Sequence, residues 1–248
     1  MREVHEGRIL GALRFVDATT GLRIRRALRV ESEVLRLYRN RSGDYAILGA
    51  GPQLASHTEA FENAPATPLA EALSFPLRVK DPGGEFLPAE VTVKLPRQSD
   101  PAKAAQEDSI FRPVEVRLHS APTRSPEANW CVVRVSVRTA GKQPLAGAGI
   151  RVTRDDNLQP AQFGVTTADG EAMVALAGLP FLFVSTGGAG DVIETRTPGK
   201  IAVFLHEDGV AVTPDMMRAN DGKLVAKGDT AVQLGAGVSL HHLFTVSP

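Results

Sequence analysis

The chain has 248 residues, enough for one large domain or two modest ones, and either arrangement can bury a hydrophobic core. Its 28 basic side chains are balanced by 28 acidic ones, so the net charge gives no reason to expect nucleic acid or an anionic membrane as a partner. The single cysteine, Cys131, excludes an intrachain disulfide and a multi-cysteine zinc cluster.

The N-terminal stretch, MREVHEGRILGALRF, lacks the apolar run of a signal peptide. A run of about 18 apolar residues, the length that spans a membrane as a helix, occurs nowhere in the sequence. We therefore expect synthesis and assembly in the cytoplasm and no membrane insertion.

The first distinctive feature in chain order is a basic run, LRIRRALR, at residues 22–29. Its arginines are Arg23, Arg25, Arg26 and Arg29. They fit three interpretations: the solvated face of a strand, a nucleic-acid patch, or a contact with an acidic partner subunit. No aromatic side chain alternates with them, which argues against nucleic acid. We carry the four arginines forward as candidate partner-binding residues.

Apolar and polar residues alternate in four segments, which is the period of half-buried β-strands. These segments are 75–80 (FPLRVK), 91–96 (VTVKLP), 114–119 (VEVRLH) and 132–138 (VVRVSVR). The 23 glycines and 17 prolines cluster between such runs, a pattern typical of antiparallel sandwiches. Helical segments are expected only at 57–72 and 101–108, which are short or broken by proline. The sequence thus predicts an all-β fold with few short helices.

Two prolines and small polar residues at 120–129 (SAPTRSPEAN) indicate a domain boundary. We predict two antiparallel β-sandwich domains, transthyretin-like or immunoglobulin-like, at 1–120 and 130–248, joined by a linker at 121–129.

The two halves resemble each other. YRNRSGDYAILGAG at 38–51 matches TTADGEAMVALAG at 166–178, and upstream of each a turn precedes a strand, in DATTGLRIRRALRV and AGKQPLAGAGIRV. An internal duplication of the fold and convergence of two sandwich domains both account for this similarity.

Ser42-Gly43 and Asp169-Gly170 are predicted turns at the matching points of the two halves. Asp-Gly between apolar residues is a strong hairpin signal, because glycine accepts the positive φ of a tight turn. A calcium loop needs several oxygen ligands, whereas the turn has one carboxylate before Gly170 and one after it. We therefore assign Asp169 a structural role.

The sequence contains no Gly-x-Ser-x-Gly elbow, His-Glu-x-x-His helix or Gly-x-x-x-x-Gly-Lys-Ser/Thr loop. His241 and His242 are adjacent in a predicted strand, so they point to opposite faces and do not share one metal ion. The glycines at 187–191 (GGAGD) are not followed by a helical pattern and fit a mobile loop better than a nucleotide site. We expect a non-enzyme without catalytic residues, metal or cofactor.

Phe181 and Phe183 belong to an apolar run at 181–184 that fits a strand buried on both faces or, if exposed, a protein interface. They join the arginines as candidate partner-binding residues. Loops at 187–197 and 213–227 are further candidates to contact a neighbouring subunit.

The rival function for a β-sandwich is carbohydrate or cell-surface binding, which usually relies on exposed aromatic platforms. The chain has one tryptophan and two tyrosines. Trp130 begins a predicted strand and is expected to be packed there.

The frame GAGIRVT, followed by GVTTADGEAMVAL and Gly178-Leu179-Pro180, resembles the carboxypeptidase regulatory-like domain. In that family a "Pro-Leu-x-Gly-Ala-x-Val" segment leads to a "Thr-Asp-x-x-Gly" turn, and the counterparts here lie at 144–150 and 167–170. The extra Gly149 and the Thr-Ala-Asp-Gly spacing depart from this pattern. The resemblance implies a transthyretin-like sandwich of about seven strands, and the family's domain is an accessory one without peptidase activity.

A second resemblance covers most of the chain. LRFVDATTG, RNRSGDYAI, FPLRVKDPGGEFLP with VTVKLP, LHSAPTR and RTPGKIAVFLHED resemble successive blocks of proteins from gene clusters of extracellular contractile injection systems, which are phage-tail-like particles. His119 replaces an aromatic residue of that pattern, and Glu85 replaces the arginine of "Gly-Arg-Phe-Leu-Pro".

This resemblance implies a structural or adaptor component of such a particle, at its cap or baseplate, or on a released or membrane-docked particle. The partners it implies are other protein subunits, with a homo-oligomer as the alternative.

Overall fold

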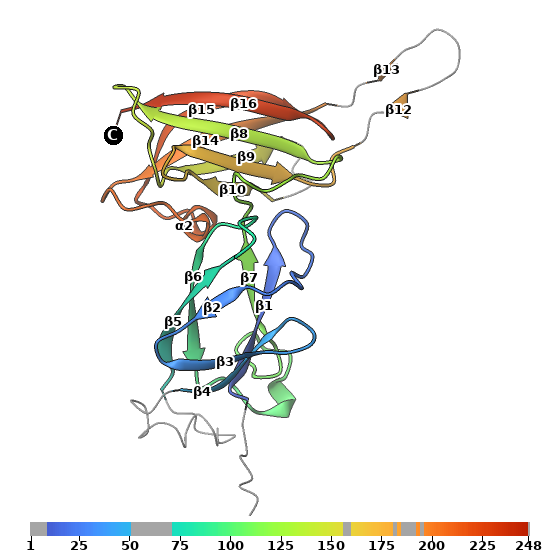
Figure 1. Cartoon of the computed structure of the whole chain (residues 1–248), viewed down its shortest axis with the longest axis vertical. Coiled ribbons are helices and arrows are strands. Elements are labelled where there is room, and N and C mark those ends of the chain that lie inside the picture. Colours follow the sequence, from blue (N-terminus) through green and yellow to red (C-terminus); the bar gives the residue numbers. More distant parts are fainter. Residues whose placement is uncertain are drawn as a thin grey trace, which may run out of the picture. The chain divides into compact units, whose positions relative to one another are not determined.

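The computed structural model describes residues 9–50, 71–155, 160–180, 183–184, 192–193 and 196–247. The chain divides into two compact units, here called the first unit (Met1–Asp17 and Gly21–Leu118) and the second unit (Ala18–Thr20 and His119–Pro248). Strands dominate both, which confirms the predicted all-β sandwich class (Figure 1). In the described part of the chain the α-helix is α2, Pro214–Ala219.

The first unit is a sandwich of a four-stranded and a three-stranded sheet. The larger sheet has the order β3 (Leu35–Arg39), β4 (Tyr45–Ala50), β1 (Gly11–Asp17) and β7 (Val114–Leu118). The smaller sheet has the order β2 (Arg29–Glu31), β5 (Leu73–Lys80) and β6 (Ala89–Leu95). Leu13 and Ile47 of one sheet pack with Leu77 and Leu95 of the other in a shared core.

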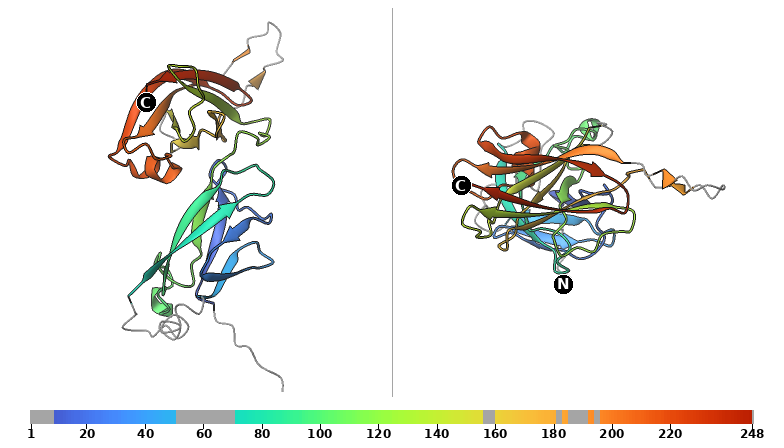
Figure 2. Two further views of the ribbon diagram at one scale, coloured as in Figure 1. Left: turned by 60° about the vertical axis from the view of Figure 1, so that its left-hand side comes forward. Right: turned by 90° about the horizontal axis from the view of Figure 1, so that it is seen from above.

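The second unit is also a four-plus-three sandwich. Its larger sheet has the order β10 (Gln162–Val165), β9 (Gly149–Arg154), β14 (Thr197–His206) and β15 (Leu224–Leu234). The smaller sheet has the order β11 (Glu171–Leu176), β8 (Cys131–Thr139) and β16 (Ser239–Val246). Ile150 and Ile201 pack against Val133 and Val135 between the layers. Figure 2 shows these two layers from other sides.

The two units share a strand-pairing scheme. In each, the first strand pairs antiparallel with the fourth and parallel with the last, as β1 does with β4 and β7, and β8 with β11 and β16. When the separate pair β12 (Phe183–Val184) and β13 (Val192–Ile193) is left out of the count, the second strand pairs with the fifth, and the fifth with the sixth. These strands are β2, β5 and β6 in the first unit and β9, β14 and β15 in the second. Only the third strand differs, because β3 pairs with β4 whereas β10 pairs with β9.

The sequence similarity between the halves maps onto this scheme. The two matching segments form the glycine turn and the fourth strand of each unit, β4 and β11. The upstream pair forms the connection that leads into β2 and β9. The similarity therefore extends from local sequence to topology, which internal duplication and convergence of two sandwich domains both account for.

One parallel pair in each unit departs from the expected purely antiparallel sheets. Parallel neighbours need a long crossover connection, and here β1 meets β7, and β8 meets β16, only after the whole unit has been traversed. Alternation along a single strand carries no information on such partners, so this pairing could not be predicted from local sequence.

Several local expectations differ in detail. The turn at Asp169-Gly170 exists, with φ +73° at Gly170, but it joins β10 and β11, which lie in different sheets, so it is not a hairpin. Of the expected helix at 101–108, a 3₁₀ helix forms at Pro101–Lys103, capped by Asp100. The other expected helix, 57–72, lies almost wholly outside the described residues.

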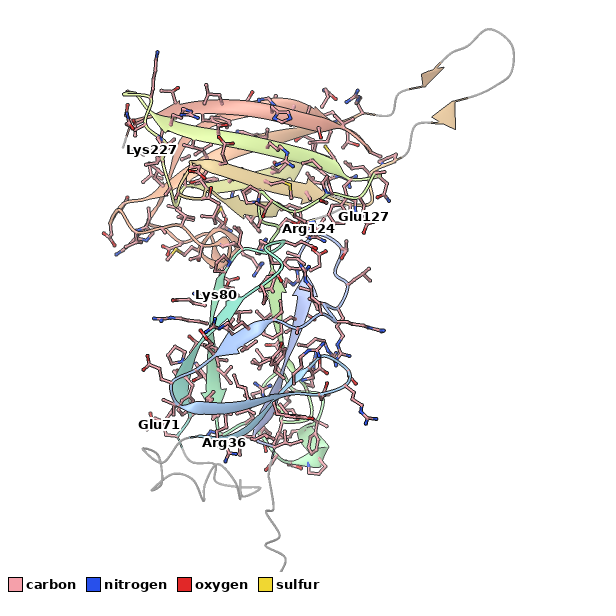
Figure 3. The ribbon with its side chains drawn as sticks, in the orientation of Figure 1. Arg36, Glu71, Lys80, Arg124, Glu127 and Lys227 are labelled. Carbon is pink, nitrogen blue, oxygen red and sulfur yellow. The ribbon has the colours of Figure 1, made fainter. Side chains whose placement is uncertain are left out.

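The segment at 121–129, expected to be a linker, packs within the second unit. Arg124 donates from Nη1 to Ser120 Oγ at 2.9 Å and lies 4.6 Å above the ring of Trp130. Arg134 donates to the carbonyl oxygen of Pro122 at 2.9 Å. Figure 3 labels Arg124 in this segment. The composition of this segment predicts a flexible connection, but its side-chain contacts hold it against the second unit.

Candidate interaction surfaces

The basic run at 22–29 does not form a regular strand. Arg23 makes an isolated bridge with Val16, and only from Arg29 does β2 begin. The Arg23 guanidinium forms an ion pair with Asp44, whose carboxylate also lies 3.4 Å from Nε of Arg14. The Asp44 side chain is mostly buried, and its ion pair with Arg23 compensates the positive charge of Arg23 inside the first unit.

Arg26 is held by two carboxylates. Its guanidinium lies 2.7 Å from Asp81 Oδ2 and 2.7 Å from Glu85 Oε1, and it lies 4.9 Å from the ring centroid of Phe86. The Asp81 carboxylate also accepts hydrogen bonds from the backbone amides of Gly83, Glu85 and Phe86. Asp81 is 1% exposed, so this is a structural site that fixes the turn after β5.

Arg29 pairs with Glu31 on the same strand at 2.5 Å. Of the four arginines predicted to bind a partner, three thus have a carboxylate partner within the first unit. The fourth, Arg25, is exposed and forms no ion pair with a described carboxylate.

Arg25 lies beside Arg39 of β3 and the turn that follows this strand. Nη2 of Arg39 donates to the carbonyl oxygen of Arg25, and the turn at Gly43 packs against its backbone. Arg36 and Arg41 are exposed, and so is Tyr38, whose side chain is 61% exposed. We call this set the basic edge: Arg25, Arg36, Tyr38, Arg39 and Arg41. Figure 3 labels Arg36, whose side chain extends away from the sheet.

The predicted loop at 213–227 contains α2. Thr213 caps its N-terminus by accepting from the amide of Met216, Pro214 occupies the first turn, and Asn220 ends it in the left-handed conformation. The signal was present in the sequence as Thr-Pro-Asp followed by Asn, although the helix is too short to show an apolar period.

The helix packs on the outer side of β9 and β10, where Met217 joins Phe204 and Val212 in a small core. A hollow of about 230 Å³ opens beside this core. Its lining comprises Arg151, Phe204, Met217, Asn220, Asp221 and Leu224. Arg151 lies 4.6 Å above the Phe204 ring, so this aromatic face is already covered.

The remaining candidates are placed as follows. Phe183 lies in β12 (Phe183–Val184) and pairs with Ile193 of β13 (Val192–Ile193), but Phe181 and most of the loop at 187–197 lie outside the described residues. Ser42 is exposed, and Gly43 has φ +87° in the turn before β4. His241 is exposed and His242 is half-buried on β16.

The aromatic residues that could form sugar platforms are mostly internal. Trp130 is 2% exposed and packs with Val132 and Met173. Tyr45 is 6% exposed, and of these three aromatic side chains only Tyr38 is open to solvent.

Two buried polar groups serve the fold. Arg97 donates to the carbonyl oxygens of Glu107, Ser109 and Arg112, and burial lowers the pKa of its guanidinium while Asp108 opposes the shift. Burial also shifts the pKa of the Cys131 thiol, in this case upward.

Within the described ranges no group of three or more His, Cys, Asp or Glu is placed to hold a metal ion. None of the described helices is both long enough and apolar enough to cross a membrane.

The described part of the chain forms two β-sandwich units, and exposed arginines without a described carboxylate partner lie at the edge strand β3 of the first unit. No protein-family model and no curated protein matches the chain. Among solved structures it is similar to chlorocatechol 1,2-dioxygenase from Pseudomonas putida, with 14% identity over 50% of this chain and 62% of the dioxygenase, at a TM-score of 0.28.

Two further similarities cover most of the chain. The TIE protein of Bacillus anthracis is 10% identical over 96% of this chain and 33% of its own length, at a TM-score of 0.28. The minor pilin of Streptococcus agalactiae is 8% identical over 96% of this chain and 95% of its own, also at 0.28. The chain thus spans less than two thirds of the dioxygenase and a third of the TIE protein. TM-scores this low carry no argument about function.

Proposed function

We propose that the chain is a non-enzymatic structural or adaptor subunit of a multi-protein assembly and that it docks through its sheet edges. The observation that carries this proposal is the basic edge, where exposed arginines without described carboxylate partners surround a strand that ends its sheet. Open strand edges recruit other chains by backbone pairing, and charge selects which chain binds.

The assembly we propose is a contractile, phage-tail-like injection particle. Support comes from the sequence blocks that resemble proteins of such gene clusters. These blocks form β1, β4, β5 and β14 and the turns beside them. They include the carboxylates of Asp44 and Asp81, which hold the arginines of the framework.

The test is sedimentation of particles from the native host. A tagged chain is expressed there, large particles are pelleted from the lysate and washed with salt, and the pellet is analysed by mass spectrometry and electron microscopy. Co-sedimentation with sheath and tube proteins after the wash is the expected result. A chain that stays in the supernatant while particles pellet contradicts the particle assignment, and a glycan-binding screen then tests the alternative.

A further inference from the structure

We propose that the free edge of β3 pairs with an extended, acidic segment of a partner subunit. This inference rests on the proposed assembly function and adds the chemistry of the partner. Three features of the first unit support it: an open backbone edge, a surplus of positive charge along that edge, and a charge pattern that disfavours pairing with a second copy of the same strand.

The backbone of β3 has a strand neighbour on only one side among the described residues. It pairs antiparallel with β4, Leu37 opposite Ile47 and Arg39 opposite Tyr45, and it is the last strand of its sheet in the described part of the chain (Figure 1). Alternate N–H and C=O groups of such an edge strand point away from the sheet. An added strand satisfies these groups with backbone hydrogen bonds, which supply affinity without regard to sequence.

The charge of the basic edge is not compensated by described residues. Arg25, Arg36 and Arg41 form no ion pair with a carboxylate of the described ranges. The acidic residue at the following turn, Asp44, is already shared by Arg14 and Arg23. Uncompensated positive charges along one edge raise the free energy of the unbound surface, and an incoming carboxylate lowers it.

Arg39 adds an unsatisfied donor at the same place. Its Nη2 donates to the carbonyl oxygen of Arg25, but its Nε is shielded from solvent and has no acceptor among the described residues. Because this nitrogen is shielded, a partner does not reach it, and Arg39 contributes to the basic edge through its positive charge.

The other edge strands of the described sheets differ from β3. The edges β2, β6, β7 and β15 each carry both signs of charge, whereas β10 and β16 carry no Lys, Arg, Asp or Glu and β11 carries one glutamate. Only β3 has two charged side chains of one sign, Arg36 and Arg39. Pairing of β3 with a second copy would add two further positive charges to the same edge, so the occupant we propose is a different and acidic strand.

The strand sets the size of the partner segment. With a rise of about 3.3 Å per residue, the five residues of β3 match roughly five residues of an extended chain. Arg36 and Tyr38 share the exposed face of the strand, whereas Arg39 lies on the other face. A carboxylate on each face of the partner would therefore meet one arginine, while an apolar side chain two residues from the first carboxylate covers the Tyr38 ring.

The experiment uses the purified full chain and a fluorescein-labelled, end-blocked peptide of about eight residues, with Glu on both faces of the extended strand and Thr and Val at the remaining positions. Fluorescence anisotropy is measured at about 0.05 M and about 0.3 M salt, because screening weakens exposed ion pairs. We expect saturable binding that weakens at the higher salt. A peptide with Lys in place of Glu is expected not to bind, and one with a central proline is expected to bind less, because proline removes a donor and breaks the pairing.

Two matched double variants distinguish binding at the basic edge from general electrostatic attraction to the chain. Arg36→Gln/Arg41→Gln removes two charges of the basic edge and is expected to weaken peptide binding about tenfold. Lys80→Gln/Lys94→Gln removes two exposed charges of the other sheet of the same unit and is expected to leave binding within about twofold. Unchanged far-UV circular dichroism shows that both variants are folded.

Three results would overturn the inference. Binding that is lost equally in both double variants indicates general electrostatics, and equal binding of the proline peptide excludes strand pairing. Single-stranded DNA that binds more tightly than the Glu peptide and loses affinity in the Arg36→Gln/Arg41→Gln variant identifies a nucleic-acid surface instead. Because these measurements use the purified chain, they are independent of the sedimentation test. If the chain binds the Glu peptide but never pellets with particles, the acidic-strand site is supported and only the particle assignment is contradicted.

Discussion

The phenol oxygen of Tyr45 donates to the carbonyl oxygen of Leu28 at 2.6 Å and accepts from the amide nitrogen of the same residue at 2.8 Å. Leu28 is buried in the irregular run before β2, where no strand neighbour satisfies its backbone. The Tyr45 ring also meets Phe15 edge-on at 5.4 Å. One side chain therefore fixes the path of the basic run through the first unit.

Tyr45→Phe keeps the ring but leaves both backbone groups of Leu28 without this partner. We expect it to lower the free energy of unfolding by about 1–3 kcal/mol, because buried unsatisfied groups retain their desolvation penalty. Tyr38→Phe, on an exposed ring, is the matched control and is expected to change it by less than about 0.5 kcal/mol. Urea denaturation followed by circular dichroism measures both, and equal effects would contradict the role of the Tyr45 hydroxyl.

Asp81→Ala removes the acceptor of Arg26 and of three turn amides. Because the carboxylate is buried and charged, we expect this substitution to lower the free energy of unfolding by about 2–4 kcal/mol. Asp229→Ala breaks the exposed pair with Lys200, whose atoms are 2.7 Å apart, and is expected to cost less than about 1 kcal/mol. Hydrogen exchange should show lost protection around β5 in the first variant. Unchanged exchange there would show that Asp81 does not hold the turn.

Gly170→Ala and Gly209→Ala test two glycines with nearly the same φ, +73° and +70°, in the second unit. A Cβ at Gly170 would lie 2.6 Å from the carbonyl oxygen of Val137, whereas one at Gly209 meets nothing within 4 Å. We expect about 1 kcal/mol of destabilisation at Gly209 from φ alone and more than about 2 kcal/mol at Gly170. Fluorescence of Trp130, in the second unit, follows the unfolding. Equal losses of unfolding free energy in the two variants would contradict a steric clash at Gly170.

Cys131 provides a pH-dependent readout. Burial raises the pKa of its thiol in the folded chain, so the unfolded state releases this proton at a lower pH than the folded state. Its contribution to stability is complete below the unfolded thiol pKa of about 8.5 and declines as pH rises through the interval up to the folded value. Cys131→Ala should flatten this part of the pH profile of the unfolding free energy. In the native protein at pH 7 the thiol should resist a maleimide, and rapid labelling would contradict its burial.

Local sequence determined much of the fold. Alternation placed β5, β6, β7 and β8, because side chains of a strand point to opposite faces at every second residue. The glycine turns and the similarity of the halves also follow from neighbouring residues. For this reason the repeated segments could be recognised before their shared topology was visible.

Only the tertiary structure decided which charges remain available. Arg26 is neutralised by Asp81, a residue 55 positions away, while Arg25 has no carboxylate partner among the described residues and contacts Arg39 of β3. The parallel pairs of β1 with β7 and β8 with β16 are equally non-local. Such contacts depend on how distant segments meet around a core. The sequence therefore indicated an arginine surface, and the packing decided which of these arginines are neutralised within the first unit and which carry the charge of the proposed edge.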